Sequence, residues 1–216
     1  NTSANSGNRW RVHFVPDEAG LWTYTVSFRA GPEVALMTDP NVGTPAAFDG
    51  LTGTFVVNAS DKLAPDLRAK GLLRYTGGRY LQFAQTKEYF IKAGADSHEN
   101  FLAYADFDDT YDTEDLLREG EAAGPKFIHR YEPHLQDWRE GDPTWKDGKG
   151  KAIIGALNYL ASKGMNSVYF ITYNIDGGDG KDVWPWIHPA EKHRFDCSKL
   201  DQWEIVFAHG TRNGMY

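Results

Sequence analysis

The pattern of apolar and polar positions divides the chain into a strand-rich first part and a second part in which strands and helices alternate. Residues 9–15 and 21–28 alternate polar and apolar side chains, as half-buried strands do, and residues 53–57 predict a further strand. Turn-forming residues separate these segments. We therefore predict an Ig-like β-sandwich over residues 1–59. A sandwich of this kind has about seven strands, so we expect the others to precede Asn1 or to come from a partner.

Residues 60–87 form a polar linker that contains a short hairpin. Residues 72–75 and 80–83 are strand-like, and Gly77 and Gly78 between them suit a tight turn. We expect this segment to connect the sandwich to the second part of the chain.

From residue 88 onward the apolar pattern switches between strand and helix. Residues 88–93 and 167–173 are apolar runs of the kind found in buried parallel strands. Residues 149–163 place their aliphatic side chains at helical spacing, which predicts an amphipathic helix. A second helix is predicted with Ser198 as its cap and Asp201 at the capping-box position.

The order strand, helix, strand, helix indicates a parallel sheet or a closed barrel over residues 88–216, in which residues 214–216 begin the next strand. Two such units cannot bury a parallel sheet on both faces. We therefore expect the chain to be an internal piece of a larger protein, whose remaining segment completes this domain. Residues 102–148 carry no strong periodic pattern beyond a short helix at 113–119, and so long a connection is usually functional.

Composition narrows the partners that the chain can have. The net charge of -7 argues against nucleic acid or an anionic membrane surface, and no apolar run is long enough to span a membrane. The single Cys197 excludes an internal disulfide, which suits a reducing compartment or a secreted bacterial protein. The content of 7 Trp, 11 Tyr and 12 Phe is high. A packed core accounts for most of these rings, and the alternative for the rest is a platform for sugar rings.

Polar side chains gather just past the two predicted parallel strands, where barrels and open sheets place their chemistry. Carboxylates and amides suit hydrogen bonding to vicinal hydroxyls, and indoles suit stacking on a sugar ring. The candidate substrate-binding residues are His98, Glu99, Asn100, Tyr173, Asn174, Asp176, Asp179, Asp182, Trp184 and Trp186. The alternative is structural, because Asp and Asn after a strand often only fold a turn, and the two tryptophans could plug a loop.

Metal, cofactor and nucleophile motifs are weak. The aspartates at 176–182 and at 106–112 lack the EF-hand pattern, and the spacing of His188, His193 and Cys197 matches no common zinc motif. We interpret these residues as solvated loop charges and cap residues. No glycine loop has the features of a phosphate-binding loop. We predict no metal and no cofactor.

Paired carboxylates are the natural chemistry for an acidic, aromatic-rich saccharide site. Glu99 is the only glutamate in the two strand-end segments, and the local sequence offers it no partner. We therefore assign no catalytic residue within this chain.

Seven motifs together resemble a known family. They are WRVHFVP (10–16), GLWTY (20–24), GADSHENFL (94–102), GDPTWKDGKG (141–150), ALNYLASKGM (156–165), GGDGKDVWPW (177–186) and DCSKLDQW (196–203). On these motifs, which span nearly the whole chain, the sequence resembles a family of bacterial, often marine, polysaccharide-degrading glycoside hydrolases. That family pairs an N-terminal Ig-like domain of otherwise unknown function with a clan-A-type (β/α)8 barrel.

The resemblance implies a secreted or periplasmic enzyme that acts by retaining hydrolysis on a polysaccharide or oligosaccharide, with algal polysaccharides among the candidates. The two catalytic glutamates, on the fourth and seventh barrel strands, are expected beyond Tyr216, so that this chain supplies the barrel's first two βα units. His98 departs from the small residue or proline expected before Glu-Asn. Two alternatives remain open, a non-catalytic carbohydrate- or matrix-binding module and a different barrel chemistry such as a lyase.

Overall fold

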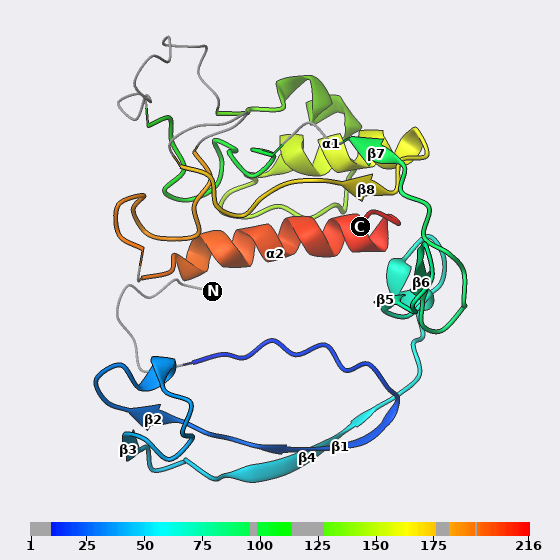
Figure 1. The fold of residues 1–216 in the computed structure, drawn as a ribbon. Coiled ribbons are helices and arrows are strands. Elements are labelled where there is room, and N and C mark those ends of the chain that lie inside the picture. The colour runs from blue at the N-terminus through cyan, green and yellow to red at the C-terminus, as the bar shows by residue number, and fades with distance from the viewer. Residues whose placement is uncertain (1–9, 96–98, 114–127, 176–181, 193) are drawn as a thin grey trace. The chain divides into compact units, whose positions relative to one another are not determined.

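The computed structural model describes residues 10–95, 99–113, 128–175, 182–192 and 194–216. The chain divides into two compact units, of which Val12–Asp61 forms one and Lys62–Tyr216 belongs to the other. The fold is mixed α/β, with small two-stranded sheets and few helices, and the described residues do not close a barrel (Figure 1).

The unit Val12–Asp61 is built from two antiparallel strand pairs. Strand β1 (Gly20–Thr25) pairs with β4 (Thr52–Val57), and β2 (Arg29–Ala30) pairs with β3 (Thr44–Pro45). A 3-10 turn, Val34–Leu36, lies between β2 and β3.

The strands predicted in this unit are confirmed in part. The strand predicted at 53–57 is present as β4, and the one at 21–28 is present as β1 but ends at Thr25. The strand predicted at 9–15 is wrong, because its described residues adopt no strand structure. Alternating side chains report which positions are apolar, whereas a strand also needs a neighbour to receive its backbone hydrogen bonds.

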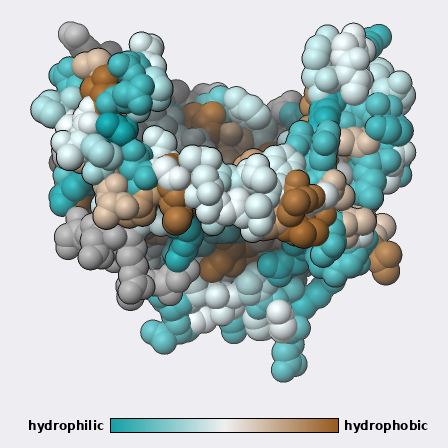
Figure 2. All heavy atoms as spheres, turned by 90° about the horizontal axis from the view of Figure 1, so that it is seen from below, coloured by the Kyte–Doolittle hydropathy of each residue, from teal (hydrophilic) through white to brown (hydrophobic). Residues whose placement is uncertain are grey.

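Both faces of the β1–β4 pair carry apolar residues. Trp22 and Phe55 lie opposite each other and stack, with ring centroids 6.4 Å apart and planes 13° apart. On the other face Leu21 lies opposite Val56, and these side chains are 70% and 64% exposed. The face of the molecule in Figure 2 shows such apolar residues as separate patches among hydrophilic ones.

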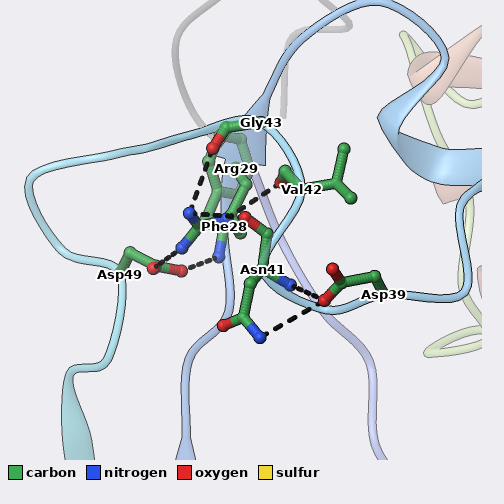
Figure 3. Close-up of polar contacts among 7 residues, drawn as sticks. All are labelled: Phe28, Arg29, Asp39, Asn41, Val42, Gly43 and Asp49. Carbon is green, nitrogen blue, oxygen red and sulfur yellow. Dashed lines mark hydrogen bonds and ion pairs between the residues drawn. The ribbon is translucent and has the colours of Figure 1, made fainter.

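Arg29 organises the loop that connects β2 and β3 (Figure 3). Its guanidinium donates hydrogen bonds of 3.0 Å to the backbone carbonyls of residues 41–43 and forms a 2.8 Å ion pair with Asp49. The second carboxylate oxygen of Asp49 accepts from the backbone N–H of Phe28 at 2.8 Å. Asp39 accepts from the backbone N–H of Asn41 and folds the turn that presents the three carbonyls. One cation therefore fixes three backbone groups and one carboxylate.

We expect the substitution Arg29→Lys to destabilise this unit by about 2 kcal/mol, because hydrogen bonds to a charged group contribute about 1.5–3 kcal/mol. The compact ammonium of lysine cannot reach the carboxylate and all three carbonyls at once. Urea denaturation followed by tryptophan fluorescence measures the loss, with Arg79→Lys as the control at an exposed arginine. An unchanged denaturation midpoint for Arg29→Lys would contradict the assignment.

The second unit begins with a 3-10 turn, Leu67–Ala69, and a hairpin. Strands β5 (Leu73–Tyr75) and β6 (Leu81–Phe83) pair antiparallel, which confirms the hairpin predicted around the two glycines. Tyr89 forms a further antiparallel bridge with Gln82.

A parallel strand pair and two helices make up the rest of this unit (Figure 1). Strand β7 (Gly94–Ala95) pairs in parallel with β8 (Ser167–Val168), and helix α1 (Lys151–Ser162) lies between them in the sequence. A 3-10 segment, Glu132–Asp137, packs on α1, and helix α2 (Cys197–Arg212) follows β8. The unit therefore contains a complete β-α-β connection followed by a helix.

The backbone of Tyr216 pairs with β8 in the manner of a third parallel strand. Its N–H donates to the carbonyl of Asn166 at 2.8 Å, and its carbonyl accepts from the N–H of Val168 at 3.0 Å. A parallel strand at 214–216 would form these bonds. They place Tyr216 beside β8, which is itself beside β7, so the three segments lie in chain order. Gly94 is needed on the other side of β8, since a Cβ there would collide with the carbonyl oxygen of Ser167.

The parallel strand predicted at 88–93 is wrong, because the bridge that Tyr89 forms in this run is antiparallel, and the strand predicted at 167–173 is present only in its first two residues. The run at 88–93 precedes β7, which begins only at Gly94, and the run at 167–173 leaves the pairing after Val168. Much of both runs is exposed, with Tyr89 and Ile91 61% and 58% exposed in the first and Tyr169 44% exposed in the second. An apolar run alone therefore indicates neither burial nor a parallel strand.

The helix predicted at 149–163 is confirmed as α1. The cap predicted for α2 is wrong, because the helix begins before Ser198. Its N-cap is Asp196, whose carboxylate accepts from the backbone N–H of Lys199 at 3.0 Å. Asp and Ser are both good caps, and the extended backbone of Asp196 decides between them.

The core of this unit lies where α1 and α2 meet the segment after β7. Leu102, Ile153 and Ile154 are fully buried, and Trp145 stacks on Phe107 with ring centroids 5.3 Å apart. Most of the aromatic residues of this unit therefore pack against each other, as the core interpretation predicted.

A buried polar network joins α1 to α2. Nδ2 of Asn158 donates to the backbone carbonyl of Asp137 at 2.9 Å and to the carboxylate of Asp142 at 2.7 Å. Nε2 of His209 donates to Oδ1 of Asn158 at 2.8 Å. His209 is 4% exposed, and this burial lowers the pKa of its imidazole below the usual value. The neutral imidazole is therefore the form that the folded structure favours.

We expect the free energy of unfolding to fall as the pH drops below about 6.5, the usual pKa of an unfolded histidine. In that range the unfolded chain binds a proton at His209 that the folded chain does not, which favours unfolding. Urea denaturation at pH 7.5 and 5.5 measures the difference, and the non-titrating variant His209→Gln should lose stability less steeply between these values. Equal pH slopes in both proteins would contradict this role.

Candidate functional site

The carboxyl ends of β7 and β8 bring the two predicted strand-end segments together. Glu99 and Asn100 follow β7, whereas Tyr173 and Asn174 follow β8. The backbone N–H of Ile171 donates to the carbonyl of Glu99 at 3.0 Å, which holds the two segments side by side beyond the paired residues. This arrangement is the one that parallel strands produce at their carboxyl edge.

Asn100 lies inside the protein rather than on its surface. It is 4% exposed, and its Oδ1 accepts a 2.9 Å hydrogen bond from Nε2 of His129. The imidazole in turn stacks on Tyr131, with ring centroids 5.0 Å apart. His129 was missed by sequence reasoning, since it lies in the long segment without periodic pattern. Asn100 therefore anchors that segment to the end of β7.

Asp182 holds the base of the loop that follows β8. It is fully buried, with φ at 76°, and its Oδ1 accepts from both the backbone N–H and the hydroxyl of Thr113. Beside it, Asn174 and Val183 form an antiparallel bridge with hydrogen bonds of 2.8 and 3.1 Å. Asp182 is thus a structural link between two segments that are far apart in the sequence, a role that differs from the local turn of the structural alternative.

The two tryptophans of the WPW sequence have different environments. Trp184 is 1% exposed, with the edge of Tyr111 against it at 5.1 Å and the ammonium of Lys199 4.8 Å from its ring centroid. It packs in the interior, as the loop-plug alternative predicted. Trp186 is half-buried and belongs to a cluster nearer the surface.

That cluster, the aromatic platform, consists of Tyr173, Trp186 and Phe195. Tyr173 contacts Trp186 edge to face at 4.7 Å, and Phe195 lies nearly parallel to Trp186 at 6.4 Å. Tyr173 is 43% exposed and Phe195 is 56% exposed. Phe195 was missed by sequence reasoning, and only its antiparallel bridge with Trp186 reveals it. The ammonium of Lys192 lies 5.5 Å from the centroid of the Tyr173 ring.

A second group of contacts fixes the acidic strap, which we define as residues 106–113. The carboxylate of Asp106 accepts from the backbone N–H of Gly150 at 3.0 Å, just before α1. Asp108 forms an ion pair with Lys146, and its backbone N–H donates to Gln202 of α2 at 2.9 Å. These residues were predicted to be solvated loop charges or cap residues, and Asp106 and Asp108 are not solvated charges because both bind neighbouring elements.

Lys199, in the first turn of α2, contacts both the acidic strap and the segment after β8. Its ammonium donates to the backbone carbonyl of Asp109 at 2.9 Å and to that of Trp184 at 3.2 Å. Burial lowers the pKa of Lys199 to about 8, against the opposing attraction of the nearby aspartates. Burial also raises the pKa of Asp196, whose carboxylate caps the same helix. Two buried ionisable side chains, Lys199 and Asp196, therefore fix the segments that form the candidate site.

The remaining predicted residues lie outside the described part of the chain. These are His98, Asp176 and Asp179, together with His193 of the weak zinc pattern. Among the residues that the structure does describe, no group of three or more His, Cys, Asp or Glu side chains is arranged to hold a metal ion. Nor is any helix in those ranges long and apolar enough to cross a membrane.

We expect Asp182→Leu to destabilise the protein by about 2–3 kcal/mol, because it leaves the N–H and hydroxyl of Thr113 buried without this acceptor. Asp182→Asn keeps one acceptor oxygen in place and should cost less than half as much. Thermal and urea denaturation of the two variants measure the difference. Equal losses for the two variants would show that the hydrogen bonds to Thr113 are unimportant.

Comparison with known proteins found no match for this chain among family models, curated proteins or solved structures.

Proposed function

We propose that this chain is part of a secreted or periplasmic glycoside hydrolase, and that it supplies one wall of a polysaccharide-binding site. The observation that carries the proposal is the aromatic platform, which lies next to the carboxyl ends of a parallel strand pair. Tyr173 and Phe195 offer exposed ring surface there, and each contacts Trp186. Aromatic faces bind the apolar C–H surface of sugar rings, and polar groups at the rim select their hydroxyls.

Polar groups suited to hydroxyls lie near the platform. Asn174 is half-buried immediately after Tyr173, and Glu99 is half-buried at the end of the neighbouring segment. The ammonium of Lys192 adds a hydrogen-bond donor above the Tyr173 ring. Carboxylate, amide and ammonium groups together can pair with the donors and acceptors of vicinal hydroxyls.

We propose further that residues 88–216 form the first part of a (β/α)8 barrel, after the linker and hairpin of residues 60–87. Supporting this, β7, β8 and Tyr216 are neighbours in sequence order, and α1 and α2 connect them. A doubly wound sheet reverses its strand order at some point, whereas a barrel keeps one order throughout. For residues 1–59 we propose an Ig-like sandwich, in which β1 and β4 supply one strand pair.

The proposed reaction is retaining hydrolysis, which needs two carboxyl groups about 5–5.5 Å apart. Among the residues that the structure describes, we assign Glu99 no such partner. We therefore place the catalytic glutamates outside it, in a segment of the same protein that completes the barrel. The residues of this chain would bind and orient the sugar rings.

The second candidate is a non-catalytic carbohydrate-binding module. It is favoured by the same platform, because stacking on exposed rings needs no carboxylate pair. Hydrolysis separates the two candidates, since only the enzyme releases new reducing ends.

The test is to incubate the full-length protein with a panel of algal and plant polysaccharides and to measure reducing ends and binding. We expect Tyr173→Ala and Phe195→Ala each to lower the affinity for a bound oligosaccharide about tenfold, which corresponds to about 1.4 kcal/mol. Tyr75→Ala, at a 72% exposed tyrosine of β5, is the matched control and should bind normally.

Hydrolysis that depends on Tyr173 supports the enzyme. Binding that depends on Tyr173, without any release of reducing ends, supports the binding module instead. If no polysaccharide in the panel binds, or if Tyr173→Ala binds as tightly as the wild type, the proposed saccharide site is wrong.

A further inference from the structure

Lys199 is a lysine with an unusual position, fully enclosed in the first turn of α2. It is 1% exposed, and its ammonium donates to carbonyls of two separate segments, Asp109 in the acidic strap and Trp184 after β8. Burying an ammonium costs free energy unless its hydrogen bonds are satisfied. A methionine could fill the same space without that cost. What the lysine adds is a connection, because its ammonium joins both segments to α2 by hydrogen bonds.

The carbonyl that Lys199 binds is close in sequence to the aromatic platform. Trp184 precedes Trp186 by two residues, and the N–H of Asp196 donates to the carbonyl of Pro185 at 2.9 Å. Asp196 is also the N-cap of α2, and it directly follows Phe195, which bridges Trp186. The start of this helix therefore fixes the chain just before Trp186 and just after Phe195. A shift at the base of this loop therefore moves the rings of the platform.

We propose that Lys199 is a positioning residue of the saccharide site, whose ammonium fixes the carbonyls of Asp109 and Trp184 and so sets the orientation of Trp186 and Phe195. What the platform binds rests on the proposed function above. The fixing of the two segments rests only on the contacts of Lys199. The charged groups that face the ammonium are the carboxylates of Asp108, Asp109 and Asp196, and Lys146 lies on the far side of Asp108 as its ion-pair partner.

The first experiment needs no ligand. Hydrogen exchange, followed by mass spectrometry, is measured on the full-length protein and on Lys199→Met, with Lys163→Met as the control at an exposed lysine beyond α1. We expect exchange at least fivefold faster in peptides from residues 106–113 and 184–192 of Lys199→Met, and unchanged exchange in α1. Unchanged exchange in both segments, or an equal increase in α1, would overturn the positioning role.

The second experiment measures affinity for an oligosaccharide at pH 7 and pH 9, on either side of the titration of Lys199. The affinity of the wild type should fall severalfold toward pH 9, as the ammonium loses its charge. Lys199→Met should bind at least fivefold more weakly at pH 7 and show no such fall. If Lys199 only stabilised the fold, Lys199→Met would bind more weakly at both pH values but would keep the pH dependence. A retained pH dependence in Lys199→Met would therefore count against the proposal.

The two proposals fail in different ways. If the wild type binds no saccharide, the proposed function is wrong, and hydrogen exchange alone decides the role of Lys199. If Tyr173→Ala abolishes binding while Lys199→Met binds like the wild type, the saccharide site stands and the positioning role is wrong.

Discussion

The first turn of α2 is the anchor on which the proposed site depends. Asp196 caps the helix and binds the loop through Pro185, while Lys199 binds the carbonyls of Asp109 and Trp184. The parallel strands themselves are only two residues long, so they cannot fix the segments that leave them. Buried side chains that bind backbone groups take over this task, because a buried N–H or carbonyl must find a partner.

The same requirement explains why few of the predicted binding residues that the structure describes are exposed. Asn100 and Asp182 are amide and carboxylate groups of the right chemistry for a sugar, yet both are buried and bind protein groups. Their cost of burial is offset by those hydrogen bonds, and in return they fix the segments around the strand ends. Among the described residues past the strand ends, the aromatic platform and the half-buried groups beside it are the ones left exposed to the proposed ligand.

Sequence patterns predicted the helices better than the strands or the site. The apolar positions of α1 repeat at helical spacing within one short segment, so local information suffices. Strand length and the residues brought together past β7 and β8 depend on pairing between distant segments, which no local pattern records. Trp184 and Trp186 are chemically identical and flank one proline, and only tertiary packing makes one a core residue. His129 and Lys199 gave no signal for the same reason, because their partners are 29 and 15 residues away or more.

In the proposed site, the residues that contact the ligand differ from the buried residues that fix the backbone. Stacking on a sugar ring gives little free energy per ring, so loss of orientation in the unbound protein would cancel much of it. Rings on a loop are useful only if their backbone is fixed before the ligand arrives. The buried ammonium of Lys199 and the cap at Asp196 supply that fixed backbone without occupying the surface. If the platform binds sugars as we propose, its exposed rings are free to vary with the sugar, whereas Lys199 and Asp196 are constrained by their buried contacts.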